Sequence, residues 1–192
     1  MGATRYDDPR ITAFGLLAEV YAGLSGVLSE QLAEHGLSLV EFEVLVRLAR
    51  SPQRQLRMTE LAGQVALTTS GITRVVDRLE RRELVCRQAC PNDRRGAWAV
   101  LTAAGEERLA AALPEHVALL ERHFTGRFSP AELTLLTTRL RQIRDEVHPG
   151  GMPGKSNSSP AAPSEEAPTV PAPELAATAP EQSRSELPDP AA

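Results

Sequence analysis

The segment "TTSGITRVVDRLERRELV" (residues 68–85), followed by "CPNDRRGAWAVLT" (residues 90–102), decides the fold of this 192-residue chain. In the first segment, apolar residues at 72, 75, 76 and 79 share one face, which predicts an amphipathic helix. In the second, a polar turn over residues 91–96 separates two apolar arms, which predicts a hairpin with strands over 84–90 and 97–101. Two adjacent arginines, Arg94 and Arg95, stand in that turn.

The residues before this helix complete a larger pattern. "TELAGQV" (residues 59–65) predicts a short helix, and a turn near Ala66 separates it from the helix that follows. Two short helices joined by a tight turn, the second with a small polar start, indicate a helix-turn-helix. Because a hairpin follows directly, the sequence predicts a winged helix.

Two more helices are predicted upstream. Apolar residues at 11, 14, 17, 21, 24 and 28 recur in steps of three and four, as in a long amphipathic helix with a near-heptad stripe. Ser38 and Glu41 then form a capping box, which opens a helix that ends before Ser51. Residues 53–58 form a connector that can adopt an extended conformation.

Two long helices are predicted downstream of the hairpin. Thr102 caps the first, and Pro114 inside it should bend it because proline removes a helix hydrogen bond. The capping box "SPAE" (residues 129–132) opens the second, with an apolar stripe over 133–147. Such stripes at both ends of a chain can pack on their own domain or on a second copy. The fold class is therefore mainly α with a small β-hairpin wing.

The positive charge of the chain is concentrated in the winged helix. The net charge is −4, but the acidic excess lies in residues 149–192 and the body over 1–148 is neutral. Between Gly71 and Gly96, seven arginines face four acidic residues, which favours contact with a polyanion. Lys155 is the only lysine, and arginine is the better match to phosphate, although a GC-rich genome would give the same preference.

The last 44 residues differ from the rest in composition. Ten of the fifteen prolines lie in residues 149–192, among Ala, Ser and Glu, so we expect a disordered tail. We find no uninterrupted run of about 18 apolar residues and no charged leader, and therefore expect a soluble, cytoplasmic protein that does not bind a membrane.

The two segments quoted first, in this register, resemble those of the MarR family of winged-helix regulators, and the resemblance covers about residues 10–148. It implies a DNA-binding lobe over 38–101 with its wing at 84–101. It also implies a dimerisation lobe built from the helices within 10–34 and 103–148. Residues 70–82 would enter the major groove of double-stranded DNA, and the wing would lie over the neighbouring minor groove.

The resemblance, together with the residue types, assigns roles to individual side chains. The expected DNA contacts are Thr68, Thr69, Ser70, Thr73, Arg74, Arg78, Arg94 and Arg95. Asp77 and Asp93 would brace the wing arginine. The expected dimer interface comprises Phe14, Leu17, Tyr21, Leu24, Leu136, Leu140 and Ile143. Two-fold symmetry then predicts a palindromic operator.

Other functions have weaker support in the sequence. The four histidines are scattered and form no recognisable catalytic set, so we expect no enzyme, and we expect neither a metal site nor a cofactor. A metal- or redox-responsive regulator, the latter through Cys86 and Cys90, and a protein-interaction module without DNA binding remain alternatives. The family implies a repressor released by a small-molecule effector, bound near residues 10–14, 35–40 and the start of the helix after Thr102.

Overall fold

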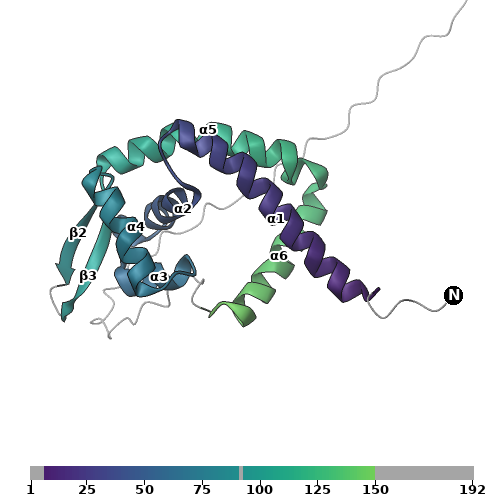
Figure 1. Cartoon of the computed structure of the whole chain (residues 1–192), viewed down its shortest axis with the longest axis horizontal. Coiled ribbons are helices and arrows are strands. Elements are labelled where there is room, and N and C mark those ends of the chain that lie inside the picture. The colour runs from purple at the N-terminus through teal and green to yellow at the C-terminus, as the bar shows by residue number, and fades with distance from the viewer. Residues whose placement is uncertain (1–6, 91–92, 150–192) are drawn as a thin grey trace, which may run out of the picture. The chain divides into compact units, whose positions relative to one another are not determined.

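The computed structural model describes residues 7–90 and 93–149, except for the side chains of residues 93–95. The chain divides into two units, residues 1–156 and 157–192, and only the first contains described residues. The predicted tail therefore lies outside the described part beyond residue 149. The helices, strands and 3-10 turns (η) are, in order, α1 (Pro9–Glu34), α2 (Leu39–Ala49), η1 (Pro52–Arg54), β1 (Gln55–Arg57), α3 (Met58–Gln64), α4 (Thr69–Arg81), β2 (Val85–Cys90), β3 (Asp93–Leu101), α5 (Ala103–His123), η2 (Thr125–Arg127) and α6 (Pro130–Val147) (Figure 1).

The predicted mainly α fold with a small β wing is confirmed. The helix-turn-helix consists of α3 and α4, and β2 and β3 form the wing directly behind it. The connector before α3 becomes a third strand, because β1 pairs antiparallel with β3 and gives the sheet order β1-β3-β2. Helices α2, α3 and α4 and the sheet share one apolar core, in which Leu45, Leu61 and Leu79 are fully buried.

The predicted extent of the wing turn is wrong. We expected a turn over 91–96, but β3 already begins at Asp93. Ala89 pairs with Ala97 whereas Cys90 pairs with Asp93, so the register shifts between these two neighbours. Such a bulge puts extra residues into one strand. The extra residues are those at 94–96, and the polar residues and glycine there are also typical of a turn, so the sequence could not separate a bulge from a turn.

The junction between α4 and α5 is closely packed. The Thr102 side chain caps α5 by accepting from the Gly105 amide, and it donates to the carbonyl of Glu83 just beyond α4. Gly105 lies so close to the same segment that a Cβ atom there would be 2.0 Å from the Leu84 carbonyl oxygen. Only glycine fits this approach.

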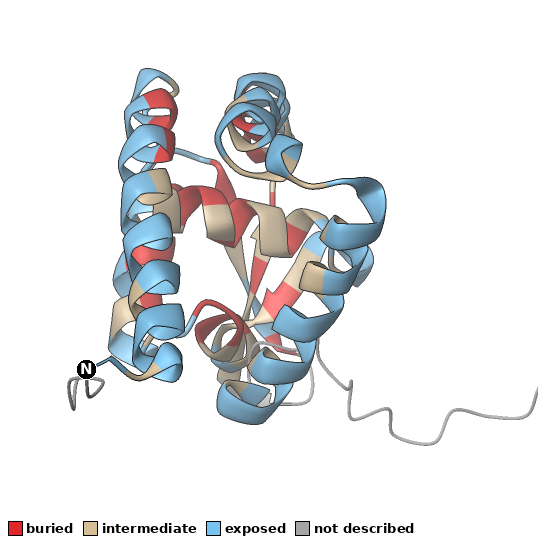
Figure 2. Cartoon of the chain, turned by 90° about the vertical axis from the view of Figure 1, so that its right-hand side faces the viewer, coloured by how far each residue is buried: buried red, intermediate tan, exposed pale blue. Residues whose placement is uncertain are grey.

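Helix α1 is largely exposed despite its apolar sequence. Its buried residues, Leu28, Gln31 and Leu32, gather near its C-terminal end (Figure 2). By length and composition alone, α1 could cross a membrane. Gly and Ser residues interrupt the apolar residues of α1, so the helix contains no uninterrupted run of about 18 apolar residues.

Candidate nucleic-acid interface

Helix α4 presents its polar side chains on the face opposite its core residues. Ile72, Val76 and Leu79 are fully buried on the inner face. The outer face carries the six DNA-contact residues predicted within the helix and its cap, all of them exposed: Thr68, Thr69, Ser70, Thr73, Arg74 and Arg78. The structure therefore brings these six residues together on one surface.

Hydroxyl groups organise the start of α4. Thr68 is the N-cap, and its Oγ1 accepts from the Gly71 amide at 3.1 Å and lies 3.1 Å from Ser70 Oγ. Thr73 donates its hydroxyl to the carbonyl of Thr69 at 2.8 Å. A hydroxyl engaged in this way keeps acceptor capacity, and small side chains leave the backbone of the helix end accessible.

Arg87 of β2 holds the wing against α4. Its Nη2 lies 2.6 Å from Asp77 Oδ1 and donates to the Thr73 carbonyl at 3.2 Å, and its Nη1 pairs with Glu80. Asp77, expected to brace a wing arginine, is thus paired with Arg87. Nothing in the sequence marks Arg87, because its contacts span seven to fourteen positions across a turn.

Arg87 also determines which charges remain available on α4. It neutralises Asp77 and Glu80, the two acidic residues of that helix. Arg74 and Arg81 form no hydrogen bond or ion pair with any residue that the structure describes. Their positive charge is therefore uncompensated, and an exposed face with uncompensated guanidinium groups suits phosphate.

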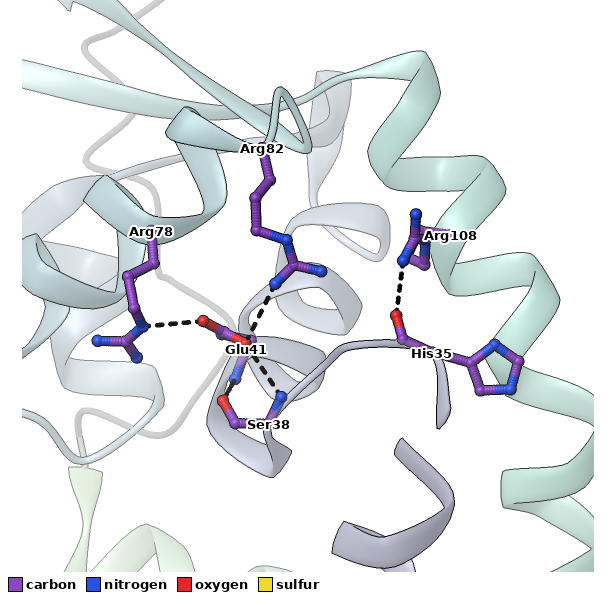
Figure 3. Close-up of polar contacts among 6 residues, drawn as sticks. All are labelled: His35, Ser38, Glu41, Arg78, Arg82 and Arg108. Carbon is purple, nitrogen blue, oxygen red and sulfur yellow. Dashed lines mark hydrogen bonds and ion pairs between the residues drawn. The ribbon is translucent and has the colours of Figure 1, made fainter. Parts of the chain in front are cut away.

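Glu41 joins the start of α2 to the end of α4. Its carboxylate accepts from the Ser38 amide at 3.0 Å and from Arg78 Nε at 2.9 Å, and it lies 3.5 Å from Arg82 Nη1 (Figure 3). Burial raises the pKa of the Glu41 carboxyl, but the hydrogen bonds from Ser38 and Arg78 outweigh it and hold that pKa below its usual value. From the sequence, Glu41 is recognisable only as part of a capping box, so sequence reasoning missed this link.

The remaining predicted DNA contacts lie on the wing. Asp93, Arg94 and Arg95 belong to β3, but their side chains lie outside the described residues. Trp98, further along the same strand, stacks under the Arg57 guanidinium, whose carbon lies 5.4 Å from the ring centre. This contact connects β1 with the base of the wing.

A cavity of about 890 Å³ lies between α1, α2, α5 and α6. Its walls combine apolar side chains, among them Leu24, Phe42 and Leu120, with arginines at positions 47, 50, 141 and 144. Of the residues expected to line an effector pocket, only Leu39 borders this cavity. The expected place of the effector pocket was based on the family resemblance alone, which does not give the position of α6 in this chain.

The structure offers no support for a metal or disulfide site. No cluster of three or more His, Cys, Asp or Glu side chains that could hold a metal occurs in the described part of the chain. Cys86 is half-buried, Cys90 is buried, and both are free thiols.

Comparison with known proteins identifies the family. Residues 37–96 match the model described as the MarR family. The HTH-type transcriptional regulator MhqR of Bacillus subtilis is 30% identical over 130 residues, which cover 68% of this chain and 88% of that protein. The chain belongs to the MarR family. This MarR-family protein is a winged-helix, DNA-binding transcriptional regulator, as its sequence predicts, and not an enzyme.

Solved structures agree with this assignment. The MarR-family regulator AbsC of Streptomyces coelicolor is 34% identical with a TM-score of 0.68, and the match covers 75% of this chain and 98% of that one. A second regulator from the same organism, solved in complex with DNA, is 34% identical with a TM-score of 0.67, covering 71% and 89% of the two chains. The chain thus shares its fold with a relative that was solved in complex with DNA.

Proposed function

We propose that this MarR-family regulator is a cytoplasmic homodimer that represses transcription by binding an inverted-repeat operator. The observation that carries the proposal is the outer face of α4, where hydroxyl groups and the uncompensated Arg74 stand together. Arg74 has the reach for a base edge or a phosphate, and the threonines and Ser70 can donate to either. Arg94 and Arg95 would contact phosphate and the narrow minor groove from the wing.

Dimerisation accounts for the exposed apolar face of the terminal helices. Of the seven expected interface residues, Leu24 and Leu136 are half-buried and the others are exposed: Phe14, Leu17, Tyr21, Leu140 and Ile143. Large apolar side chains exposed in such number on two helices indicate an interaction site. A second copy fits it better than a membrane does, because the C-terminal end of α1 is fixed in the protein through buried Leu28 and Leu32.

An effector would act through the cavity between α1, α2, α5 and α6. Apolar walls with several arginines suit a small apolar anion, such as an aromatic acid. The cavity is bounded by helices assigned to both lobes, so an occupant that fits one arrangement of the lobes better would shift the population between arrangements. The operator would be released if, in that arrangement, the distance between the two α4 helices did not match the spacing of the two half-sites.

The proposal is tested by recovering bound DNA from fragmented genomic DNA and titrating the recovered fragments at several salt concentrations. We expect preference for a fragment with two half-sites about one helical turn apart, with affinity that falls as salt rises. Equal affinity for that fragment and for random duplex of the same length would overturn the proposal.

A further inference from the structure

We propose that Glu41 is a positioning residue for DNA binding: it holds the Arg78 guanidinium in the orientation that contacts a phosphate. The inference rests on the proposed function, since it concerns how α4 meets DNA. The Glu41 side chain is only 7% exposed, yet it binds an arginine side chain that is 44% exposed. The pair thus crosses from the protein interior to the outer face of α4.

In the Arg78 guanidinium, Nε binds Glu41 and the two terminal nitrogens remain available for a phosphate. Its Nε donates to Glu41 Oε1 at 2.9 Å, and this is its only hydrogen bond to any described residue. The two terminal nitrogens point away from Glu41 (Figure 3). An arginine has five N–H donors in a fixed planar fork, so fixing Nε sets the direction of the remaining four. Those four are the donors that a phosphate would use in a bidentate contact.

The other partners of Glu41 hold the carboxylate itself in place. The Ser38 amide donates to it within the capping box, and Arg82 pairs with it from the next turn of α4. The neighbouring α1–α2 turn is fixed in addition by Arg108 of α5, which donates to the His35 carbonyl at 2.6 Å. Arg78 is therefore anchored to a rigid junction, and it loses little side-chain freedom when it binds a phosphate.

A set of single and double substitutions tests this role. Glu41→Gln keeps the size of the side chain but removes its charge, and we expect operator affinity to fall about tenfold, with a salt slope lower by about one. Arg78→Ala should have a similar effect, and the double variant should bind no more weakly than Arg78→Ala alone. Glu43→Gln is the matched control, since Glu43 lies on the same helix but pairs with Arg47. It should leave both quantities unchanged.

Arg78→Lys provides a second test that leaves Glu41 untouched. Lysine has one compact ammonium group and cannot bind Glu41 and a phosphate with separate, coplanar donors. We expect the same loss as for Arg78→Ala. Retained affinity in Arg78→Lys, tighter binding by Glu41→Gln, or independent effects of the Glu41 and Arg78 substitutions would each overturn the positioning role. Failure of the unaltered protein to prefer any operator would instead overturn the proposed function.

Discussion

The turn between α3 and α4 contains a residue in an unfavourable backbone conformation. Ala66 has φ of 54°, in the left-handed region that glycine adopts without steric cost. Ala66→Gly should therefore raise the free energy of unfolding by up to about 1 kcal/mol, despite the greater freedom of glycine in the unfolded chain. Chemical denaturation measures the difference. Ala118→Gly, in an exposed part of α5 beyond Pro114, should lower the same quantity by about 1 kcal/mol. Destabilisation in both variants would contradict the assigned strain.

A buried histidine makes the stability of the molecule sensitive to acid. His116 of α5 contacts the Phe42 ring, and its Nδ1 lies 3.2 Å from Gln31 Oε1 on α1. Burial lowers the pKa of this imidazole below its ordinary value of 6.5. The unfolded chain therefore takes up the proton more readily, so this contribution to stability is complete above pH 6.5 and declines as the pH falls below it.

Unfolding titrations at pH 8 and pH 5.5 measure this contribution. His116→Gln removes the titrating group, and the variant should lose less stability between the two pH values than the unaltered protein. Equal losses would show that other groups account for the acid sensitivity.

Hydrogen bonds between residues close in sequence could be predicted, whereas hydrogen bonds and ion pairs between residues distant in sequence could not. The capping boxes at Ser38 and Ser129 and the Thr68 cap are all present, because each joins residues only three positions apart. The partners of Glu41 and Arg87 depend on how α4 packs against α2 and β2. That packing exists only in the folded chain.

The wing is the element whose role is most directly testable. We expect Arg95→Ala to weaken operator binding by about 1–3 kcal/mol, because the arginine would lie in the minor groove. Gel-shift titration at fixed salt measures the change. Arg122→Ala removes an equal charge from the C-terminal end of α5 and should have no effect. Unchanged affinity in Arg95→Ala would exclude the wing tip from the interface.

Helices were easier to predict than strands in this chain. Each long helix shows a clear apolar period and a start signal such as Thr102 or Pro130, and both signals are local. The sheet was harder, because β1 has only three residues and acquires its identity by pairing with β3. The bulge near Cys90 likewise depends on which residues of the two strands face each other.

At the scale of the whole molecule, the oligomeric state is the decisive quantity. Sedimentation at micromolar concentration should show a dimer. Phe14 is 73% exposed on α1, so Phe14→Glu should leave the folded chain intact but weaken the dimer by about 2 kcal/mol or more. Thr12→Glu, two residues earlier and outside the stripe, is the control. A monomer for the unaltered protein, or an unaffected dimer in Phe14→Glu, would contradict the assigned interface.

The arrangement of the lobes was the part least accessible from sequence. The cavity between α1, α2, α5 and α6 could not be predicted from the sequence, because its walls come from four helices distant in sequence. The apolar stripe of α1 could be predicted from its period. Its packing partner could not, since the same period describes a helix that packs on its own core and one that packs on another chain.

The contact of Gly105 with the Leu84 carbonyl has a mechanical consequence. No side chain separates the two backbones there, and the Thr102 hydroxyl ties them together. Reorientation of the first turn of α5 therefore cannot be absorbed by a change of rotamer. Because Leu84 follows the end of α4 by three residues, we expect a rotation of the first turn of α5 to be transmitted directly to the end of α4.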